Sequence, residues 1–200
     1  MEFLASLMPS FVSEHGAAIV VVIPLLAAAV AAVMPNGRIG WGIALLAVIA
    51  SALVAIAISV DVQANGVISY AMGGWQPPAG IEFRIDNLNA VLLLLIGFTG
   101  VLSVIYALPS VADEIADDRQ ALFYSAFLVC FAGLLGVAIT GDAFNMFVFL
   151  EISSISTYVL VGMGASNDRR ALTAAYNYLV LGTIGATFFV IGVGFLYMAT

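Results

Sequence analysis

Charged residues are scarce in this sequence, and lysine is absent from it. Only 8% of its 200 residues are charged, and the five basic residues are all arginines set against 12 acids. A soluble domain carries about 25% charged residues, because its surface must be wetted. The shortage excludes an ordinary soluble domain, and the absence of lysine excludes the basic surfaces that bind nucleic acid or, as polybasic patches, anionic membrane surfaces.

Side chains for metal, disulfide and cofactor chemistry are equally few. Cys130 is the single cysteine and His15 the single histidine, so no disulfide or Cys/His metal site can form within the chain. The sequence also lacks a phosphate-binding glycine loop, a nucleophile triad and a dinucleotide fingerprint. We therefore expect no cofactor and no metal, and an enzyme of the soluble type is the weakest hypothesis.

Long apolar runs make up most of the chain, which is 64% hydrophobic with a mean hydropathy of +1.16. Each run has about 20 residues or more, enough to cross ~30 Å of hydrocarbon as a helix. Small residues spaced four apart, as at Ala132/Gly136 and Gly182/Ala186, are typical of close helix packing in membranes. The sequence predicts a single, all-α, polytopic membrane domain with six transmembrane helices, at about Gly16–Met34, Ile39–Val60, Asn87–Leu108, Gln120–Thr140, Ala143–Gly164 and Ala171–Ala199.

The arginines predict the orientation of these spans. Arg38, Arg119, Arg169 and Arg170 fall in the first, third and fifth loops, which share one side of the membrane, while Arg84 falls on the other side. Because arginine is enriched in cytoplasmic loops, this four-to-one division places the odd-numbered loops in the cytoplasm. We expect both termini on the external side.

The long loop at Asp61–Asp86 contains two strand-like runs, Val67–Tyr70 and Ile81–Ile85. Gly73–Gly80, between these runs, is dense in glycine and proline, which favour turns. The pattern predicts an external β-hairpin lying on the membrane surface. The alternative is an irregular loop in which Trp75 is anchored at the interface.

One acidic residue lies where charge is costly. Of 17 charged residues, 16 fall outside the predicted spans, and the exception is Glu151. It lies ~12 Å along its helix, near the middle of the bilayer. A carboxylate there costs on the order of 3 kcal/mol or more to insert, so an acid at this depth is rare without a function. Its protonation depends on the group opposite it, as a proton relay requires.

Helical spacing associates two polar residues with Glu151. Ser154 and Tyr158, at i+3 and i+7, share its face and are candidates to line a hydrated proton path. In the alternative interpretation Glu151 only hydrogen-bonds a neighbouring helix. Asp142 lies on the opposite face at the start of the helix, where it is expected to be an N-cap. The remaining hydroxyls are expected to bond back to their own backbone: Ser153, Ser156 and Thr157.

Three stretches carry a family resemblance. Residues 69–86 resemble the external hairpin of the D-type membrane subunit of the Mrp-type multisubunit cation/proton antiporters. Residues 140–154 resemble the junction of that family's fourth and fifth helices, with Glu151 at the position of its fifth-helix glutamate, and residues 178–185 resemble its sixth helix. The resemblance runs along the whole chain. The wider superfamily includes the antiporter-like subunits of complex I and of membrane-bound hydrogenases.

The resemblance implies the first part of a fourteen-helix antiporter-like fold built around two inverted repeats. In that family the glutamate faces a lysine on a broken seventh helix, and protons pass along a hydrated row of charges. This chain has no lysine and ends with the sixth helix. We therefore expect other membrane subunits as partners, including a chain or segment that supplies the remaining helices and intramembrane lysines. The near absence of a tail after Met198 favours a fragment over a naturally split subunit.

Three functions follow as hypotheses. The first is a multi-pass subunit, in the cell inner membrane, of an antiporter that exchanges protons for a monovalent cation such as sodium, with Glu151 on the proton path. The second is a proton-pumping subunit of a complex I or hydrogenase type of redox pump, which would make the complex a translocase of the NADH:quinone oxidoreductase kind. The third is a non-conducting membrane scaffold, which the absence of lysine favours.

Overall fold

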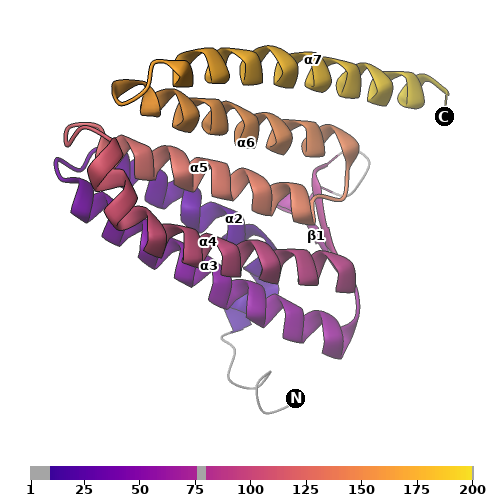
Figure 1. Cartoon of the computed structure of the whole chain (residues 1–200). Coiled ribbons are helices and arrows are strands. Elements are labelled where there is room, and N and C mark those ends of the chain that lie inside the picture. The colour runs from indigo at the N-terminus through magenta and orange to yellow at the C-terminus, as the bar shows by residue number, and fades with distance from the viewer. Residues whose placement is uncertain (1–9, 76–79, 200) are drawn as a thin grey trace.

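The computed structural model describes residues 10–75 and 80–199 and is mostly helical (Figure 1). Among these residues, six helices are long and apolar enough to cross a membrane, which confirms the predicted number of spans. They are α2 (Ser10–Ala32), α3 (Gly37–Asn65), α4 (Asn87–Glu114), α5 (Gln120–Ile139), α6 (Ala143–Met163) and α7 (Arg170–Ala199), with a short 3₁₀ turn, η2 (Gly164–Ser166), before α7.

Two helices extend beyond the predicted apolar runs. α2 begins at Ser10 instead of Gly16, and α3 continues to Asn65 instead of Val60. An apolar run marks the part of a helix inside the bilayer, but backbone hydrogen bonding can continue into polar turns outside it. α3 ends at Gly66, whose φ of 89° is a left-handed conformation that suits glycine. The predicted hairpin loop therefore starts later than the hydropathy indicates.

Charged residues occupy several terminal turns of the helices, outside the predicted apolar spans. Within the described residues, however, Glu151 is the only charged residue in the interior of a helix. The others in helices lie within five residues of an end: Glu14, Arg38, Asp61, Asp113, Glu114 and Arg170.

The helix α4 continues beyond the third predicted span, which ends at Leu108, through Pro109 to Glu114. Proline lacks an N–H and weakens the backbone bonding of the preceding turn, but membrane helices tolerate it where neighbours satisfy the freed groups. Here Trp41 Nε1 donates to the Val104 carbonyl at 2.8 Å. This bond joins α3 to α4 five residues before Pro109, whereas the carbonyl that the proline leaves without its helical donor is that of Ile105.

The helices form layers, with α7 outermost, then α6, then α5, and with α2, α3 and α4 on the far side (Figure 1). α5 is the central helix, because it contacts α2, α3, α4 and α6. α7 packs chiefly on α6 and has no buried residue along its length. The core therefore lies around α5, and burial falls steadily towards α7.

A β-hairpin connects α3 to α4. β1 (Ile68–Ala71) pairs antiparallel with β2 (Glu82–Ile85), with Ile68 opposite Ile85, and a 3₁₀ turn, η1 (Met72–Gly74), follows β1. Residues 76–79 of the predicted turn lie outside the described residues. β2 buries Phe83 and Ile85 against the helices. The hairpin is therefore part of the packed structure.

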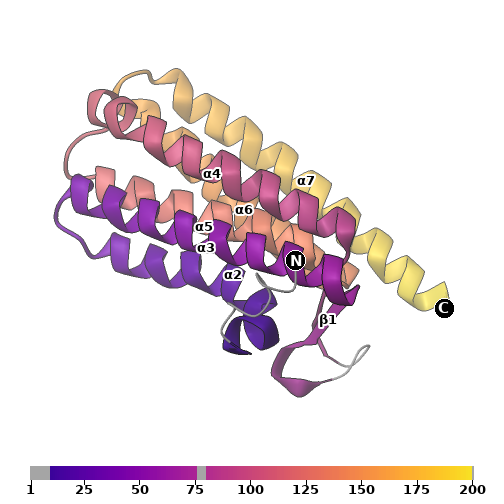
Figure 2. The same cartoon turned by 90° about the horizontal axis from the view of Figure 1, so that it is seen from below.

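The two ends of the bundle differ in charge. The hairpin, the start of α2 and the end of α7 lie at one end, which we call the hairpin end (Figures 1 and 2). The connections from α2 to α3, from α4 to α5 and from α6 to α7 lie at the other, which we call the arginine end because Arg38, Arg119, Arg169 and Arg170 lie in or next to these connections. At the hairpin end, His15 Nδ1 is 3.2 Å from the Tyr70 hydroxyl, and this contact joins α2 to β1.

Candidate functional site

The start of α6 is held by polar contacts at the hairpin end. The Asp142 carboxylate accepts from the Asn145 backbone N–H at 2.6 Å, which confirms the predicted N-cap. The buried Asn145 side chain donates to the Thr140 hydroxyl at 3.1 Å. The Gly141 N–H donates to the Glu82 carbonyl at 2.8 Å. The hairpin therefore fixes the junction from which α6 begins.

Close packing against α5 fixes α6 further along its length. A Cβ at Gly133 would lie 2.7 Å from the Ser153 backbone nitrogen, and a Cβ at Gly136 would overlap the Phe149 ring. The Phe149 ring in turn lies 6.0 Å from that of Phe83 on β2. The small residue at position 136 thus permits a close helix approach, as its spacing from Ala132 predicts.

Glu151 is the ninth residue of α6 and is half-buried. It lies ~12 Å from the start of the helix, far from both ends of the bundle. In the part of the chain that the structure describes, its carboxyl has no hydrogen-bond or ion-pair partner. All five arginines lie in loops, in the hairpin or at helix ends, so this chain places no cation at the depth of Glu151.

Ser154 and Tyr158 lie along α6 beside Glu151, and both are half-buried. The Tyr158 ring lies 6.5 Å from that of Tyr178 on α7, and its phenol is within electrostatic range of Glu151. The α5 side of the helix carries other hydroxyls. As predicted, three of these bond back to carbonyls of their own helix at 2.7–2.9 Å: Ser153, Ser156 and Thr157.

Two glycines of α7 lie near the depth of Glu151. Gly162 of α6 faces Ala175, and Tyr158 faces Tyr178, so the antiparallel register brings Glu151 level with about Gly185. Cβ atoms at Gly182 and Gly185 would meet nothing within 4 Å. The packing predicted for Gly182 is therefore not made within the described residues. Gly185 is exposed, so this face of α7 is uncovered by the rest of the described chain.

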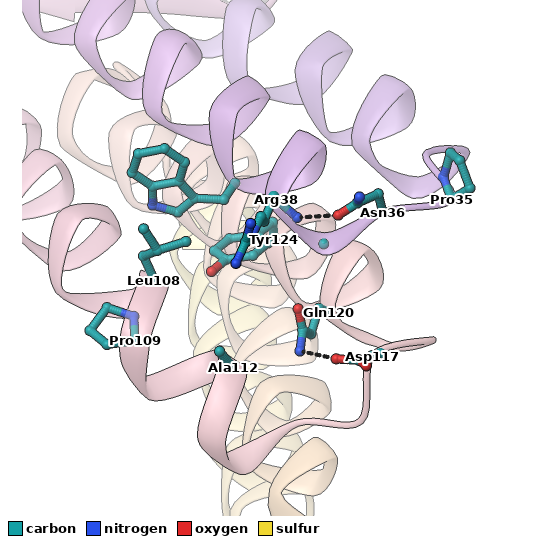
Figure 3. A pocket seen from close by; sticks show the side chains of 11 residues that line it. Pro35, Asn36, Arg38, Leu108, Pro109, Ala112, Asp117, Gln120 and Tyr124 are labelled. Carbon is teal, nitrogen blue, oxygen red and sulfur yellow. Dashed lines mark hydrogen bonds between the residues drawn. The ribbon is translucent and has the colours of Figure 1, made fainter.

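A second polar region, at the arginine end, is not predicted by the sequence analysis. A cavity of about 1000 Å³ opens between the start of α3, the end of α4 and the start of α5 (Figure 3). Trp41 and Tyr124 lie one turn inside the ends of their helices. Aromatic residues at this depth are typical of the membrane interface, and they are the one feature of the sequence that could have indicated this site. Its polar and aromatic lining comprises Asn36, Arg38, Trp41, Asp117, Gln120 and Tyr124. Among the described residues, no three His, Cys, Asp or Glu side chains are grouped as a metal site requires.

Comparison with known proteins gives one family match. Residues 140–200 match the family model described as "NADH:quinone oxidoreductase/Mrp antiporter, TM". The matched stretch contains the whole of α6, including Glu151, and the whole of α7.

Relatives match over most of the chain. It is 39% identical over 194 residues to the N-type subunit of the NADH-quinone oxidoreductase of Desulforudis audaxviator, covering 94% of this chain and 37% of that protein. It is 31% identical over 154 residues to the D-type subunit of the Na(+)/H(+) antiporter of Alkalihalophilus pseudofirmus, covering 77% of this chain and 30% of that protein. The chain thus spans about a third of these relatives' length.

A solved structure has the same arrangement of helices. A chain of the membrane-bound sulfane sulfur reductase, an archaeal respiratory membrane complex, superposes with a TM-score of 0.80 at 33% identity. The match covers 92% of this chain and 37% of that one. Together with the relatives, it confirms the predicted resemblance to the D-type antiporter subunit and to the complex I membrane subunits.

Proposed function

The chain is homologous to the antiporter-like membrane subunits that Mrp antiporters share with NADH:quinone oxidoreductases, and on that premise we propose that it carries protons through Glu151. The observation that supports this role is the carboxyl itself. It is half-buried at mid-helix and has no partner among the described residues. A carboxyl with no structural bond to satisfy is free to exchange a proton.

Glu151 would need a cation opposite it in order to switch. Two unit charges 4 Å apart attract by roughly 4 kcal/mol at an effective dielectric constant of 20, so a protonated lysine at that distance would hold the carboxylate ionised. Loss of that lysine's proton would release the carboxylate to accept one. This chain has no lysine, so we propose that a further segment or partner chain supplies it beside α6 and α7.

Ser154 and Tyr158 extend the proposed path along α6. A hydroxyl and a phenol on the same stripe as the carboxyl can orient water. We propose that protons reach Glu151 along this stripe. Ser153, Ser156 and Thr157 are excluded from the path because their hydroxyls are engaged by their own backbone.

We further propose that the chain forms the first part of a fourteen-helix subunit within a multisubunit complex of the cell inner membrane. The arginine end would face the cytoplasm, and the hairpin and both termini would lie outside. The arginine distribution and the match to about a third of longer relatives support this arrangement. The transported ions would be protons, exchanged for sodium in the antiporter case.

The Glu151→Gln variant tests the role of the carboxyl. In the assembled complex, reconstituted in proteoliposomes with a pH-sensitive dye inside, we expect proton-coupled sodium transport to fall at least tenfold, because an amide cannot release a proton. Glu114→Gln, an exposed acid at the arginine end, is the matched control and should transport normally. Full transport by Glu151→Gln would disprove the role assigned to Glu151.

A redox-driven pump is the second candidate, and one observation favours it. The identity to the NADH-quinone oxidoreductase subunit, 39% over 94% of the chain, exceeds that to the antiporter subunit. The same proteoliposomes separate the two functions: proton movement driven by quinone reduction indicates a redox pump, and movement driven by a sodium gradient indicates an antiporter. A scaffold would transport normally with Glu151→Leu, provided that the complex assembles.

A further inference from the structure

The cavity at the arginine end has no part in the proposed proton path, and its walls differ in chemistry. α4 supplies an apolar wall through Leu108 and Pro109 (Figure 3). The start of α3 supplies Arg38 and the turn before α5 supplies Asp117, both with exposed side chains. At about 1000 Å³, the cavity is large enough for the polar part of a lipid together with the beginning of its chains.

Its two charges do not neutralise each other. Among the described residues, the one ion pair within 4.0 Å joins Arg170 to Asp168. The Arg38 guanidinium therefore has no partner within these residues. Asp117 accepts one hydrogen bond, from Gln120 Nε2 at 2.9 Å, through a single carboxylate oxygen. A free cation and a half-used anion therefore line one cavity, an arrangement that suits a ligand with both a negative and a positive group.

The position of the cavity matches the headgroup layer of a bilayer. It lies at the ends of three spanning helices, and Trp41 and Tyr124, residue types enriched at membrane interfaces, border it. Their polar atoms already make hydrogen bonds. Trp41 Nε1 donates to the Val104 carbonyl at 2.8 Å, and the Tyr124 hydroxyl donates to the Ala107 carbonyl at 3.4 Å. These bonds hold the two rings at the cavity wall, where they offer mainly apolar surface.

We propose that this cavity binds one phospholipid whose headgroup joins a phosphate to a primary ammonium, as in phosphatidylethanolamine. Arg38 would pair with the phosphate, and the free oxygen of Asp117 would accept from the ammonium. The lipid chains would run along Leu108 and Pro109 into the bilayer. An anionic headgroup such as phosphatidylglycerol would be repelled by Asp117, and the quaternary ammonium of phosphatidylcholine has no N–H to donate to it.

Native mass spectrometry of the assembled complex tests this proposal. The complex is stripped with detergent and then offered equal amounts of phosphatidylethanolamine, phosphatidylglycerol and phosphatidylcholine. We expect one phosphatidylethanolamine per copy of the chain, preferred by about tenfold over the other two because of its charge-assisted hydrogen bonds. Arg38→Gln should abolish this retention. Asp117→Asn should shift the preference to phosphatidylglycerol, because it removes the repelling charge.

Two controls keep the result specific. Arg169→Gln, an exposed arginine outside the cavity, should retain the lipid as the unmodified complex does. Soluble phosphoethanolamine at equal concentration should not displace the lipid; if it does, the ligand is a soluble phosphate ester and the lipid assignment is wrong. Equal retention of the three lipids, or retention unchanged by both cavity variants, would overturn the proposal, whatever the outcome for proton transport.

Discussion

Replacing Gly133 by alanine tests the packing that positions Glu151. A Cβ added there would lie 2.7 Å from the backbone nitrogen of Ser153, 2.9 Å from its Cβ and 3.0 Å from its Cα. Ordinary contacts between such atoms are about 3.5–4.0 Å. Two of these three neighbours are backbone atoms of α6, so no side-chain rotation can relieve the overlap. α5 and α6 would have to move apart by roughly 1 Å.

The expected cost is that of an overpacked core, about 1–3 kcal/mol in the free energy of unfolding. Gly42→Ala in α3 is the matched control, since a Cβ there meets nothing within 4 Å. In an exposed helix, alanine is about 1 kcal/mol more favourable than glycine, so the control should be neutral or slightly stabilising. Both variants gain the same helix propensity, so they should differ in stability by the overpacking cost alone, about 1–3 kcal/mol.

Both stability and transport report the displacement. Thermal unfolding of the purified complex should show a lower midpoint for Gly133→Ala than for Gly42→Ala. Because Glu151 lies two residues before Ser153, its carboxyl would move with α6, and a shift of about 1 Å at a reacting group can cost about a hundredfold in rate. If Gly133→Ala unfolds and transports like the control, the close approach of α5 and α6 does not hold Glu151 in place.

Two further predictions concern the arginine end and the orientation of the chain. Trp41→Phe keeps an aromatic ring but removes the bond to the Val104 carbonyl, so chemical unfolding of the complex should show a loss of about 1 kcal/mol. An unchanged free energy of unfolding would mean that this bond does not stabilise the contact between α3 and α4. The orientation can be tested by cysteine labelling after Cys130 has been replaced by serine. Ala64→Cys at the hairpin end should react with a membrane-impermeant maleimide added outside intact cells, whereas Asn167→Cys at the arginine end should react only after lysis. The reverse pattern would invert the proposed orientation.

Hydropathy and turn chemistry were sufficient to predict the helices. Six apolar runs of bilayer length permit little besides six helices, and the N-cap at Asp142 follows from an acid directly before an apolar run. The helix ends were harder to predict, because hydropathy reports the bilayer and not the hydrogen bonding. Pro109 shows this most clearly: locally it indicates a helix end, but in the structure α4 continues through it.

The candidate sites were predictable to different degrees. Glu151 could be identified because a lone mid-span carboxyl is unusual in any sequence, and helical spacing then placed Ser154 and Tyr158 beside it. The lipid cavity could not be identified in the same way. Arg38 and Asp117 lie 79 positions apart, Arg38 in the first turn of α3 and Asp117 in the turn before α5, and each alone is an ordinary charge at a helix end. Only the packing of α3, α4 and α5 brings them to one cavity.

The outermost position of α7 has a consequence for assembly. This helix packs chiefly on one neighbour, α6, and none of its residues is buried, so within this chain it resembles the unpaired edge strand of a β-sheet. Detaching it would break one helix interface, whereas detaching α5 would break four. The bundle is therefore expected to build outwards from α5, with α7 docking late. Its open side is where the proposed additional helices would join, and Glu151 belongs to α6, the helix on which α7 packs.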